Sequence, residues 1–289
     1  MSARRLRGLG AAAALALALT ACGGGDDAAT EVVTDAKFPA GSSMAKFNEA
    51  GTIKIGTKFD QPGIGAKKPG ADAPEGFDPE MAKIVAAKLG IEPDKIKWVE
   101  TVSDNREPFL QNGTVDLVFA SYSITDERRQ VVGQAGPYYV TGQQLLVAKD
   151  DDSIKGPDDL EGKKVCSVEG STSIKTVEEE YGANPAPFAT YSECVQQLLS
   201  GSVDAVTTDG AILLGYTAEN PDKLKVVGDA FSEERYGIGF KKDDTKLCNF
   251  LNETLEASFE DGSWQEAFDQ TLGEAGVEAP EAPTVDPCE

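Results

Sequence analysis

Apolar and polar positions follow two different periods between residues 53 and 120. Short apolar runs at 53–57 (IKIGT), 96–100 (IKWVE) and 115–120 (VDLVFA) are typical of buried strands. Between the first two, the segment 76–90 places Met81, Ile84, Val85 and Leu89 at helical spacing and ends on a glycine. Strands that alternate with helices in this way predict a parallel α/β sheet.

A second alternating series follows, bracketed by two extended runs at 139–150 and 235–244. It contains a strand that begins at 163, strands at 186–190, 203–208 and 224–228, and helices at 171–182, 191–201 and 209–219. Two more helices are predicted near 245–260 and 262–272. A compact segment between two extended runs indicates a chain that crosses twice between two lobes.

The N-terminus has the three parts of a secretory signal with a lipidation site. A basic stretch, MSARRLRGLG, precedes an apolar stretch, AAAALALALT, and the segment closes at Cys22. The apolar part is too short to span a membrane, so residues 1–21 are predicted to be a signal peptide. The ending resembles the bacterial lipoprotein pattern, in which Cys22 becomes the lipidated first residue; a cleaved signal followed by a free cysteine is the alternative. Residues 22–49 are polar and glycine-rich, and we expect a flexible tether.

Charge narrows the classes of partner. The full chain carries −22, and loss of Arg4, Arg5 and Arg7 with the signal peptide takes the mature chain, of about 268 residues, to −25. Nucleic acid and anionic lipid headgroups are therefore poor partners. An anionic ligand would have to be held by cations gathered in a cleft, and the candidates are Arg106, Arg128 and Lys58.

Histidine is absent, which excludes Ser-His-Asp and Cys-His catalysis and histidine-bearing zinc sites. We expect no cofactor and no metal. Besides Cys22 the chain has four cysteines, and an even count in an exported protein predicts two disulfides with three possible connectivities. A metal site of four thiolates is the alternative, although no CxxC spacing occurs.

The most informative stretch is 103–139, where the apolar run at 115–120 gives way to a polar turn. Ser121, Ser123 and Thr125 supply hydroxyls there, and the planar guanidinium of Arg128 matches a carboxylate with two parallel hydrogen bonds. A ligand site at a strand end has this character. The alternative is a solvated arginine on a surface loop.

The turn reads Ser-Ile-Thr-Asp-Glu-Arg at 123–128 and resembles the family 3 extracellular solute-binding proteins, the amino-acid receptors of ABC importers. The resemblance extends from Ile53 to about Leu272. It implies a two-lobe α/β fold of the periplasmic-binding-protein type II class, with a ligand cleft between the lobes and two hinge crossings. Lobe 1 would comprise 50–141 plus 238–272, and lobe 2 would comprise 142–237. The tail, 273–289, is rich in Pro and Glu, which argues against a packed element.

The family also implies roles for residues at other strand ends. Arg128 would clamp the α-carboxylate of an amino acid, Ser171 and Thr172 would contact it from the second lobe, and Asp209 would receive the α-ammonium. From the residues alone, Ser171 and Thr172 cap a helix whose N-terminus favours an anion. Asp209 has a plain alternative as the cap of the next helix.

The side-chain pocket indicates an acidic ligand. The run Ser103-Asp104-Asn105-Arg106 resembles the segment that binds the distal carboxylate in glutamate and aspartate receptors; a surface arginine is the alternative for Arg106. Lys58 stands where the family more often has an acidic residue, and Phe59 is the nearest substitute for a stacking aromatic. The run KFDQPG is similar to the glutamate-binding lipoproteins of Gram-positive importers. Glutamate is the predicted ligand, with aspartate, asparagine and glutamine unranked behind it.

The resulting hypothesis is a monomeric receptor, lipid-anchored to the outer face of the cell membrane through Cys22, that delivers glutamate to a membrane permease. Given the two lobes, the favoured disulfides are Cys166–Cys194 within lobe 2 and Cys248–Cys288 tying down the tail. Two alternatives use the same fold. One is an amino-acid lyase or dehydratase with Glu169 or Asp209 as the acid or base, which would need a raised carboxyl pKa; the other is a ligand-sensing module.

Overall fold

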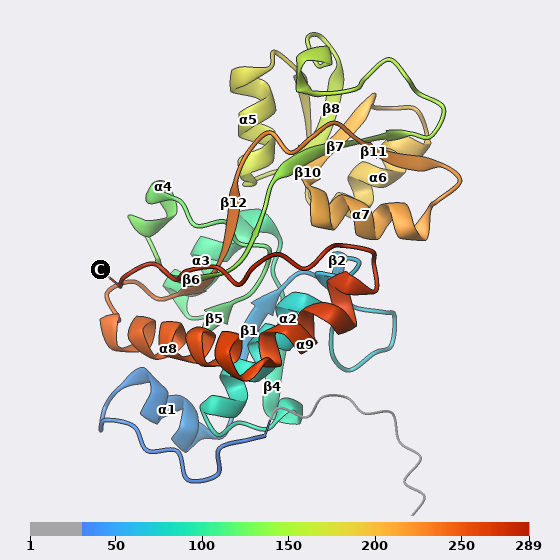
Figure 1. The fold of residues 1–289 in the computed structure, drawn as a ribbon. Helices are drawn as coiled ribbons and strands as arrows, with labels where there is room; N and C mark the ends of the chain where they lie inside the picture. The colour runs from blue at the N-terminus through green and yellow to red at the C-terminus, as the bar shows by residue number, and fades with distance from the viewer. Residues whose placement is uncertain (1–30, 289) are drawn as a thin grey trace, which may run out of the picture.

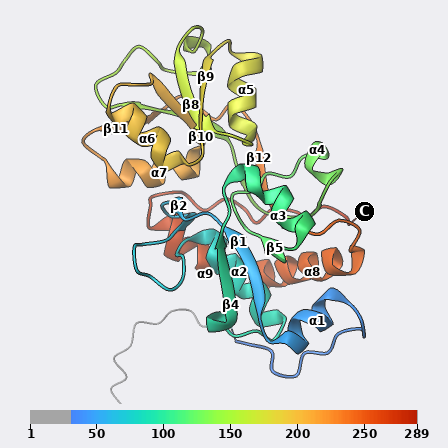
Figure 2. The same ribbon diagram turned by 180° about the vertical axis from the view of Figure 1, so that it is seen from behind.

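The computed structural model of the protein describes residues 31–288, so the predicted signal peptide and Cys22 lie outside the described residues. Two five-stranded sheets form two lobes, which Figures 1 and 2 show from opposite sides. This confirms the α/β class. Among residues 31–288, no helix combines the length and apolarity needed to cross a bilayer.

The sheet of lobe 1 has the strand order β4-β1-β5-β12-β6. These strands are β4 (Ile96–Glu100), β1 (Ile53–Thr57), β5 (Leu117–Val118), β12 (Glu234–Phe240) and β6 (Gly133–Thr141). The three strands expected from the first apolar runs are parallel, whereas β12 pairs antiparallel with both β5 and β6. The sheet is therefore mixed rather than purely parallel, because the extended runs that cross between lobes join its edge.

The sheet of lobe 2 has the order β11-β7-β10-β8-β9. Its strands are β11 (Leu224–Val227), β7 (Gln143–Ala148), β10 (Ala205–Asp209), β8 (Lys164–Val168) and β9 (Asn184–Phe188). Here β10, β8 and β9 are parallel, and β7 is antiparallel to its two neighbours. A small hairpin, β2 (Asp60–Gln61) with β3 (Gly65–Ala66), projects from lobe 1 toward lobe 2.

Helices cover both sheets. Lobe 1 carries α1 (Ser43–Ala50), α2 (Phe77–Lys88), α3 (Arg106–Asn112), α4 (Asp126–Arg129), α8 (Thr245–Asp261) and α9 (Ser263–Phe268), and lobe 2 carries α5 (Thr172–Glu180), α6 (Tyr191–Leu199) and α7 (Gly210–Glu219). Short helical turns are η1 (Pro93–Lys95), η2 (Ser103–Asn105), η3 (Pro157–Asp159) and the π-helical η4 (Asp269–Gly273).

The chain passes from lobe 1 to lobe 2 between β6 and β7, at Gly142, and returns between β11 and β12. Glu234, the first residue of β12, pairs with Thr141, the last residue of β6. Residues 234–237 therefore belong to the sheet of lobe 1, four residues ahead of the return point expected at 238. The two adjacent crossings are the natural axis for opening and closing the cleft.

The expectation of a flexible tether reaching to residue 49 is wrong for its later part. Residues 43–50 form α1, whose N-cap Ser42 accepts a hydrogen bond from the Ala45 amide at 3.1 Å. Met44 is buried, and the ring of Phe38 lies edge-on to Phe250 at 5.6 Å. Local composition is polar here, but a few apolar side chains at the right spacing bury themselves against lobe 1.

The expectation that the C-terminal tail makes no packed element is also wrong. The tail has no regular secondary structure, yet Val277 and Val285 pack against the core. Asp286 forms ion pairs with Arg129 at 2.6 Å and with Arg235 at 2.5 Å. Figure 1 shows the tail, in dark red, running back across lobe 1 past β6 and β12. These contacts with distant residues hold the tail in place, although its composition is typical of a disordered segment.

Both favoured disulfides are formed, between Cys166 and Cys194 and between Cys248 and Cys288. All four cysteines are therefore used, which excludes the thiolate metal site. Cys166 and Cys194 are fully buried in lobe 2, whereas Cys288 is partly exposed near the chain end.

Because of this difference in burial, mild reduction of the native protein should open Cys248–Cys288 before Cys166–Cys194. The double variant Cys248→Ser/Cys288→Ser should lose about 2–4 kcal/mol of unfolding free energy, since the freed tail no longer has its cross-link. Urea denaturation of parent and variant measures the loss. Equal midpoints and slopes would show that the ion pairs of Asp286 hold the tail without the disulfide.

Candidate functional site

A narrow cavity of about 10 Å³ lies between the lobes and receives side chains from both. Lobe 1 contributes Ser103, Arg106, Ser121, Ser123 and Arg128, and lobe 2 contributes Ser171, Thr172, Ser173, Tyr191, Thr208 and Asp209. This space is about that of one water molecule, so an amino acid can enter only when the lobes move apart. Eight predicted site residues are thus brought together from segments far apart in the chain.

Arg106 is almost completely buried, with 2% of its surface exposed. Its Nε donates to the Ser103 carbonyl at 3.0 Å, and Nη1 donates to the carbonyls of Ala120 and Ser121 at 3.2 and 3.1 Å. The alternative of a surface arginine is therefore wrong. Burial, and then the charge of Arg128, lower the pKa of Arg106 to about 10.

Arg128 lies on α4, a single turn that Thr125 caps by accepting the Arg128 amide at 3.2 Å. Its Nη1 donates to the Ser123 carbonyl at 2.7 Å, and its Nε lies 3.3 Å from Glu107 Oε1. Only about a tenth of the residue is exposed, so it is not a solvated loop arginine.

The two guanidinium groups share their surroundings. Both stack on the ring of Tyr122, at 4.6 Å for Arg106 and 5.0 Å for Arg128, and the Tyr122 hydroxyl donates to Glu107 at 2.8 Å. Both also donate through Nη2 to the Gly170 carbonyl of lobe 2 at 3.1 Å. Two cations held this close repel one another, and an anion between them would relieve the repulsion.

Lobe 2 meets the arginines at the N-terminus of α5. Ser171 is the N-cap of this helix and accepts the Ile174 amide at 3.2 Å, so the capping role predicted for it is confirmed. Thr172 donates to Glu234 at 3.0 Å. Gly170 has φ of +75°, and a Cβ there would lie 2.9 Å from Cα of Asp104. Only glycine allows this close approach of the lobes.

Asp209 ends β10 and occupies the N-cap position of α7, yet its side chain makes no capping hydrogen bond. One carboxylate oxygen accepts the Tyr236 hydroxyl, while the other, Oδ1, is buried and has no hydrogen-bond partner among the described residues. Burial, and then the charge of Glu234, raise the pKa of Asp209 to about 7. An incoming ammonium group would donate a hydrogen bond to the free Oδ1 and would stabilise the ionised form of Asp209.

The structure places the two predicted residues of the first-strand loop outside the cavity lining. Lys58 is buried behind it, where Nζ donates to Ser103 Oγ at 2.7 Å, and burial followed by the charge of Arg106 lowers its pKa to about 7. Phe59 is half-buried, with Lys67 Nζ 5.1 Å from its ring centre. In this arrangement Phe59 stacks on Lys67 rather than facing the cavity.

Sequence reasoning missed Tyr191, Ser173 and Thr208 in the lining and Asp78 behind it. Asp78 is fully buried and accepts the Ser121 amide at 2.7 Å and the Tyr138 hydroxyl at 2.6 Å, which holds the turn that carries Ser121. Burial raises its pKa to about 6. One signal was available: Asp78 is a carboxylate in the first turn of a mostly apolar helix.

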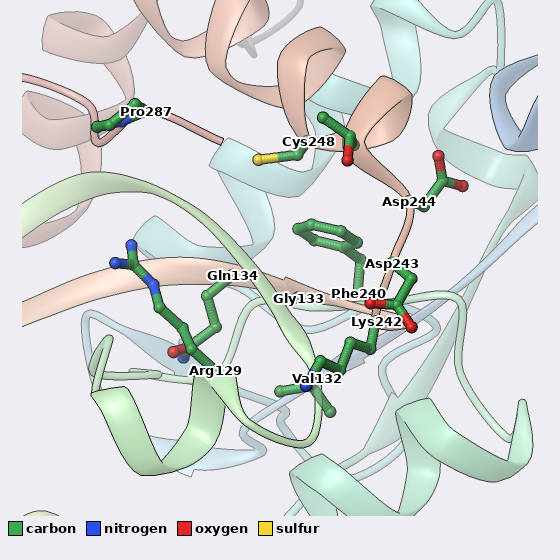
Figure 3. A pocket seen from close by; sticks show the side chains of 11 residues that line it. Arg129, Val132, Gly133, Gln134, Phe240, Lys242, Asp243, Asp244, Cys248 and Pro287 are labelled. Carbon is green, nitrogen blue, oxygen red and sulfur yellow. The ribbon is translucent and has the colours of Figure 1, made fainter. Parts of the chain in front are cut away.

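A larger cavity, of about 230 Å³, lies within lobe 1 beside the C-terminal disulfide (Figure 3). Figure 3 shows Phe240 in its centre and Arg129 at its edge. Its cations are already engaged, since Arg129 pairs with Asp286 and Lys242 donates to the Gln130 carbonyl. We therefore take the cleft between the lobes as the functional site.

Residues 53–274 match the sequence profile of the bacterial extracellular solute-binding proteins, family 3. The chain belongs to this family. A glutamate-binding protein of Corynebacterium efficiens is 39% identical over 93% of the chain and 91% of its own length. The glutamine-binding protein of a Bacillus subtilis ABC transporter is 35% identical over 82% and 86%.

Among solved structures, an ancestral arginine-binding protein bound to glutamine has a TM-score of 0.72 at 38% identity, over 77% of this chain and 98% of that one. The two-lobe type II fold is thus confirmed, and so is the class of function: this is a substrate-binding protein of the amino-acid ABC transporter family. The relatives are binding proteins rather than enzymes.

The raised pKa of Asp209 predicts a pH-dependent cost to stability. A carboxyl whose folded pKa lies above its unfolded pKa of about 3.8 contributes stability that is full below pH 4 and is lost as pH rises toward 7. Asp209→Asn avoids this loss. Without amino acids, its free energy of unfolding at pH 8 should therefore be about 1–3 kcal/mol higher than that of the parent. Its advantage should grow from pH 4 to 7 and then level off.

Urea unfolding across this pH range tests the prediction, with the exposed Asp72→Asn as the matched control. A stability difference that does not change with pH, or a loss of stability at pH 8, would contradict the assignment of a buried ionised Asp209.

Proposed function

We propose that the protein is the receptor of an ABC importer for glutamate, held at the outer face of the cell membrane through lipid on Cys22. The cleft closes on the amino acid, and the loaded receptor delivers it to the permease as a monomer. One observation carries this proposal: two buried guanidinium groups and a carboxylate with a free acceptor oxygen converge on one small cavity between lobes.

The charges define how an amino acid would lie. Arg128 would hold the α-carboxylate, with the α5 N-terminus near Ser171 and Thr172 adding its partial positive charge. Asp209 would receive the α-ammonium on its free oxygen, while Tyr236 holds the other oxygen. Because Arg128 and Asp209 belong to different lobes, a single ligand links the two and favours the closed state.

Arg106 would bind the distal carboxylate of the ligand. With both α-groups bound, this second guanidinium still needs a counter-charge, and a ligand carboxylate supplies it. Behind the cavity, Lys58 donates at 2.7 Å to Ser103, which does line it. Glutamate fits this arrangement best, in keeping with the glutamate-binding relative at 39% identity. Aspartate, asparagine and glutamine are the competing ligands.

An enzymatic function is the second candidate, because Asp209 has the raised pKa that a general acid or base would need. Glu169, the other candidate acid or base, is exposed and does not line the cavity. Incubation with glutamate followed by product analysis by mass spectrometry separates the two functions: a receptor returns glutamate unchanged, and a lyase does not.

Replacing the arginines should separate recognition of any amino acid from recognition of an acidic one. Arg128→Ala should weaken glutamate and glutamine alike by about 2–5 kcal/mol, because the α-carboxylate loses its charge-assisted pair. Arg106→Met keeps the length of the side chain without its charge, so glutamate should weaken by a similar amount while glutamine weakens little. Calorimetric titration of both variants with both ligands measures these changes.

Arg129→Ala is the matched control, since Arg129 neighbours Arg128 on α4 but pairs with Asp286 outside the cleft. It should bind both ligands like the parent. If Arg106→Met remains folded, by circular dichroism and melting temperature, and still binds glutamate as tightly as the parent, Arg106 does not recognise the distal carboxylate.

The lipid anchor has its own test. Expressed with its signal sequence in a Gram-positive host, the parent should sediment with membranes and carry a lipid-modified Cys22 by mass spectrometry. Cys22→Ser should lose the lipid and appear in the medium, because the protein then has no acyl chain to hold it. An unmodified Cys22 in a membrane-free parent would refute the anchor.

A further inference from the structure

The hairpin that follows β1 reaches across the cleft and packs on lobe 2. Pro62, in the turn between β2 and β3, lies against α7 so closely that a Cβ at Gly215 would be 2.2 Å from the Pro62 carbonyl oxygen. The hydroxyl of Tyr216, next along α7, donates to the Asp60 carbonyl. This contact lies away from the two hinge crossings, so it forms only where the lobes meet.

Asp60 uses its side chain to cap a helix of the opposite lobe. Its Oδ2 accepts the amides of Tyr191 and Ser192 at 2.8 and 3.2 Å. These are the first two residues of α6, whose amides have no carbonyl partner within the helix. A carboxylate there makes charge-assisted hydrogen bonds and also faces the positive end of the helix dipole.

The remaining amides of this helix start are satisfied from within lobe 2. Thr190 accepts the Glu193 amide at 3.3 Å, and Glu193 accepts the Thr190 amide at 3.1 Å, which is a capping box. Only the amides of Tyr191 and Ser192 therefore depend on Asp60. The helix start is complete when the lobes are together, and these two amides face water when the lobes part.

This contact also reaches the site. Asp60 does not line the cavity between the lobes, but Tyr191, whose amide it binds, does. The Tyr191 side chain is buried and lines the cavity together with Ser171 and Thr208. Docking of Asp60 thus fixes the end of α6 from which Tyr191 enters the cavity.

We propose that Asp60 is an interlobe latch: it caps α6 across the cleft, stabilises the closed state and slows release of the bound amino acid without touching it. The proposal rests on capture by lobe closure. Since the latch forms after the ligand has entered the open cleft, its loss should change the rate of dissociation rather than the rate of association.

Stopped-flow measurement of glutamate association and dissociation tests this. Asp60→Ala should dissociate about 5–30 times faster, the range expected for losing a charge-assisted hydrogen-bonded cap, with an association rate within about twofold of the parent. Asp60→Asn, which keeps an acceptor oxygen but loses the charge, should lie between the two. Tyr216→Phe should show a smaller increase, because it removes one donor and leaves the cap in place. Asp72→Ala, an exposed aspartate on the same lobe, is the control.

Two further readouts separate a latch from a general structural role. Without ligand, the melting temperature of Asp60→Ala should equal that of Asp72→Ala, because the open protein does not use the contact. With saturating glutamate, hydrogen exchange at the Tyr191 and Ser192 amides should be protected in the parent and fast in Asp60→Ala. A dissociation rate equal to the control, equal protection of these amides, or a lowered melting temperature without ligand would each overturn the latch.

If the parent does not bind glutamate, the proposed ligand fails and not the latch. The same variants are then measured with whichever of the twenty amino acids raises the melting temperature of the parent, and the outcomes keep the same meaning.

Discussion

Two buried guanidinium groups that share the ring of Tyr122 and the carbonyl of Gly170 are the constraint on which the rest of this structure depends. Like charges at this separation in a desolvated cleft are unfavourable unless they are neutralised. Glu107 partly neutralises the charge of Arg128, and backbone carbonyls accept hydrogen bonds from Arg106. The remaining positive potential is directed at the narrow cavity between the lobes, within a protein whose net charge is strongly negative.

The fold supplies the means of holding such a site. The Phe77 ring packs among Tyr138, Tyr139, Trp264 and Phe268, with ring centres 5.7–6.1 Å apart, and anchors α2 on lobe 1. The next residue, Asp78, then fastens the Ser121 turn that faces the cleft. In lobe 2 the carboxyl end of β10 presents Asp209, in the manner of open α/β sheets, whose ligands bind beyond strand ends. Binding groups are thus divided between two rigid lobes.

Much of this was predictable from the sequence. Hydrophobic periodicity located most strands and helices. The Ser-Ile-Thr-Asp-Glu-Arg motif pointed to Arg128, and resemblance to the family pointed to Arg106, Ser171 and Asp209. Local patterns failed where distant contacts decide the outcome. The tail looked disordered because its anchors, Asp286 and Cys288, act on residues far away in the chain.

The same limit applies inside the site. Phe59 was expected near the ligand, yet its ring packs on Lys67, and the aromatic residue in the cavity is Tyr191, from the other lobe. Asp60 and Tyr191 are 131 positions apart, and no periodicity relates them. Contacts between lobes depend on how the two sheets are set against each other, which a single sequence does not display.

Calorimetric titration of the parent protein with each of the twenty amino acids is the most direct test of this account. A cleft with two guanidinium groups and one free carboxylate oxygen predicts one ligand per chain, with glutamate bound more tightly than glutamine and with lysine and arginine unbound. Tightest binding of lysine or arginine, or binding of no amino acid at all, would contradict the account.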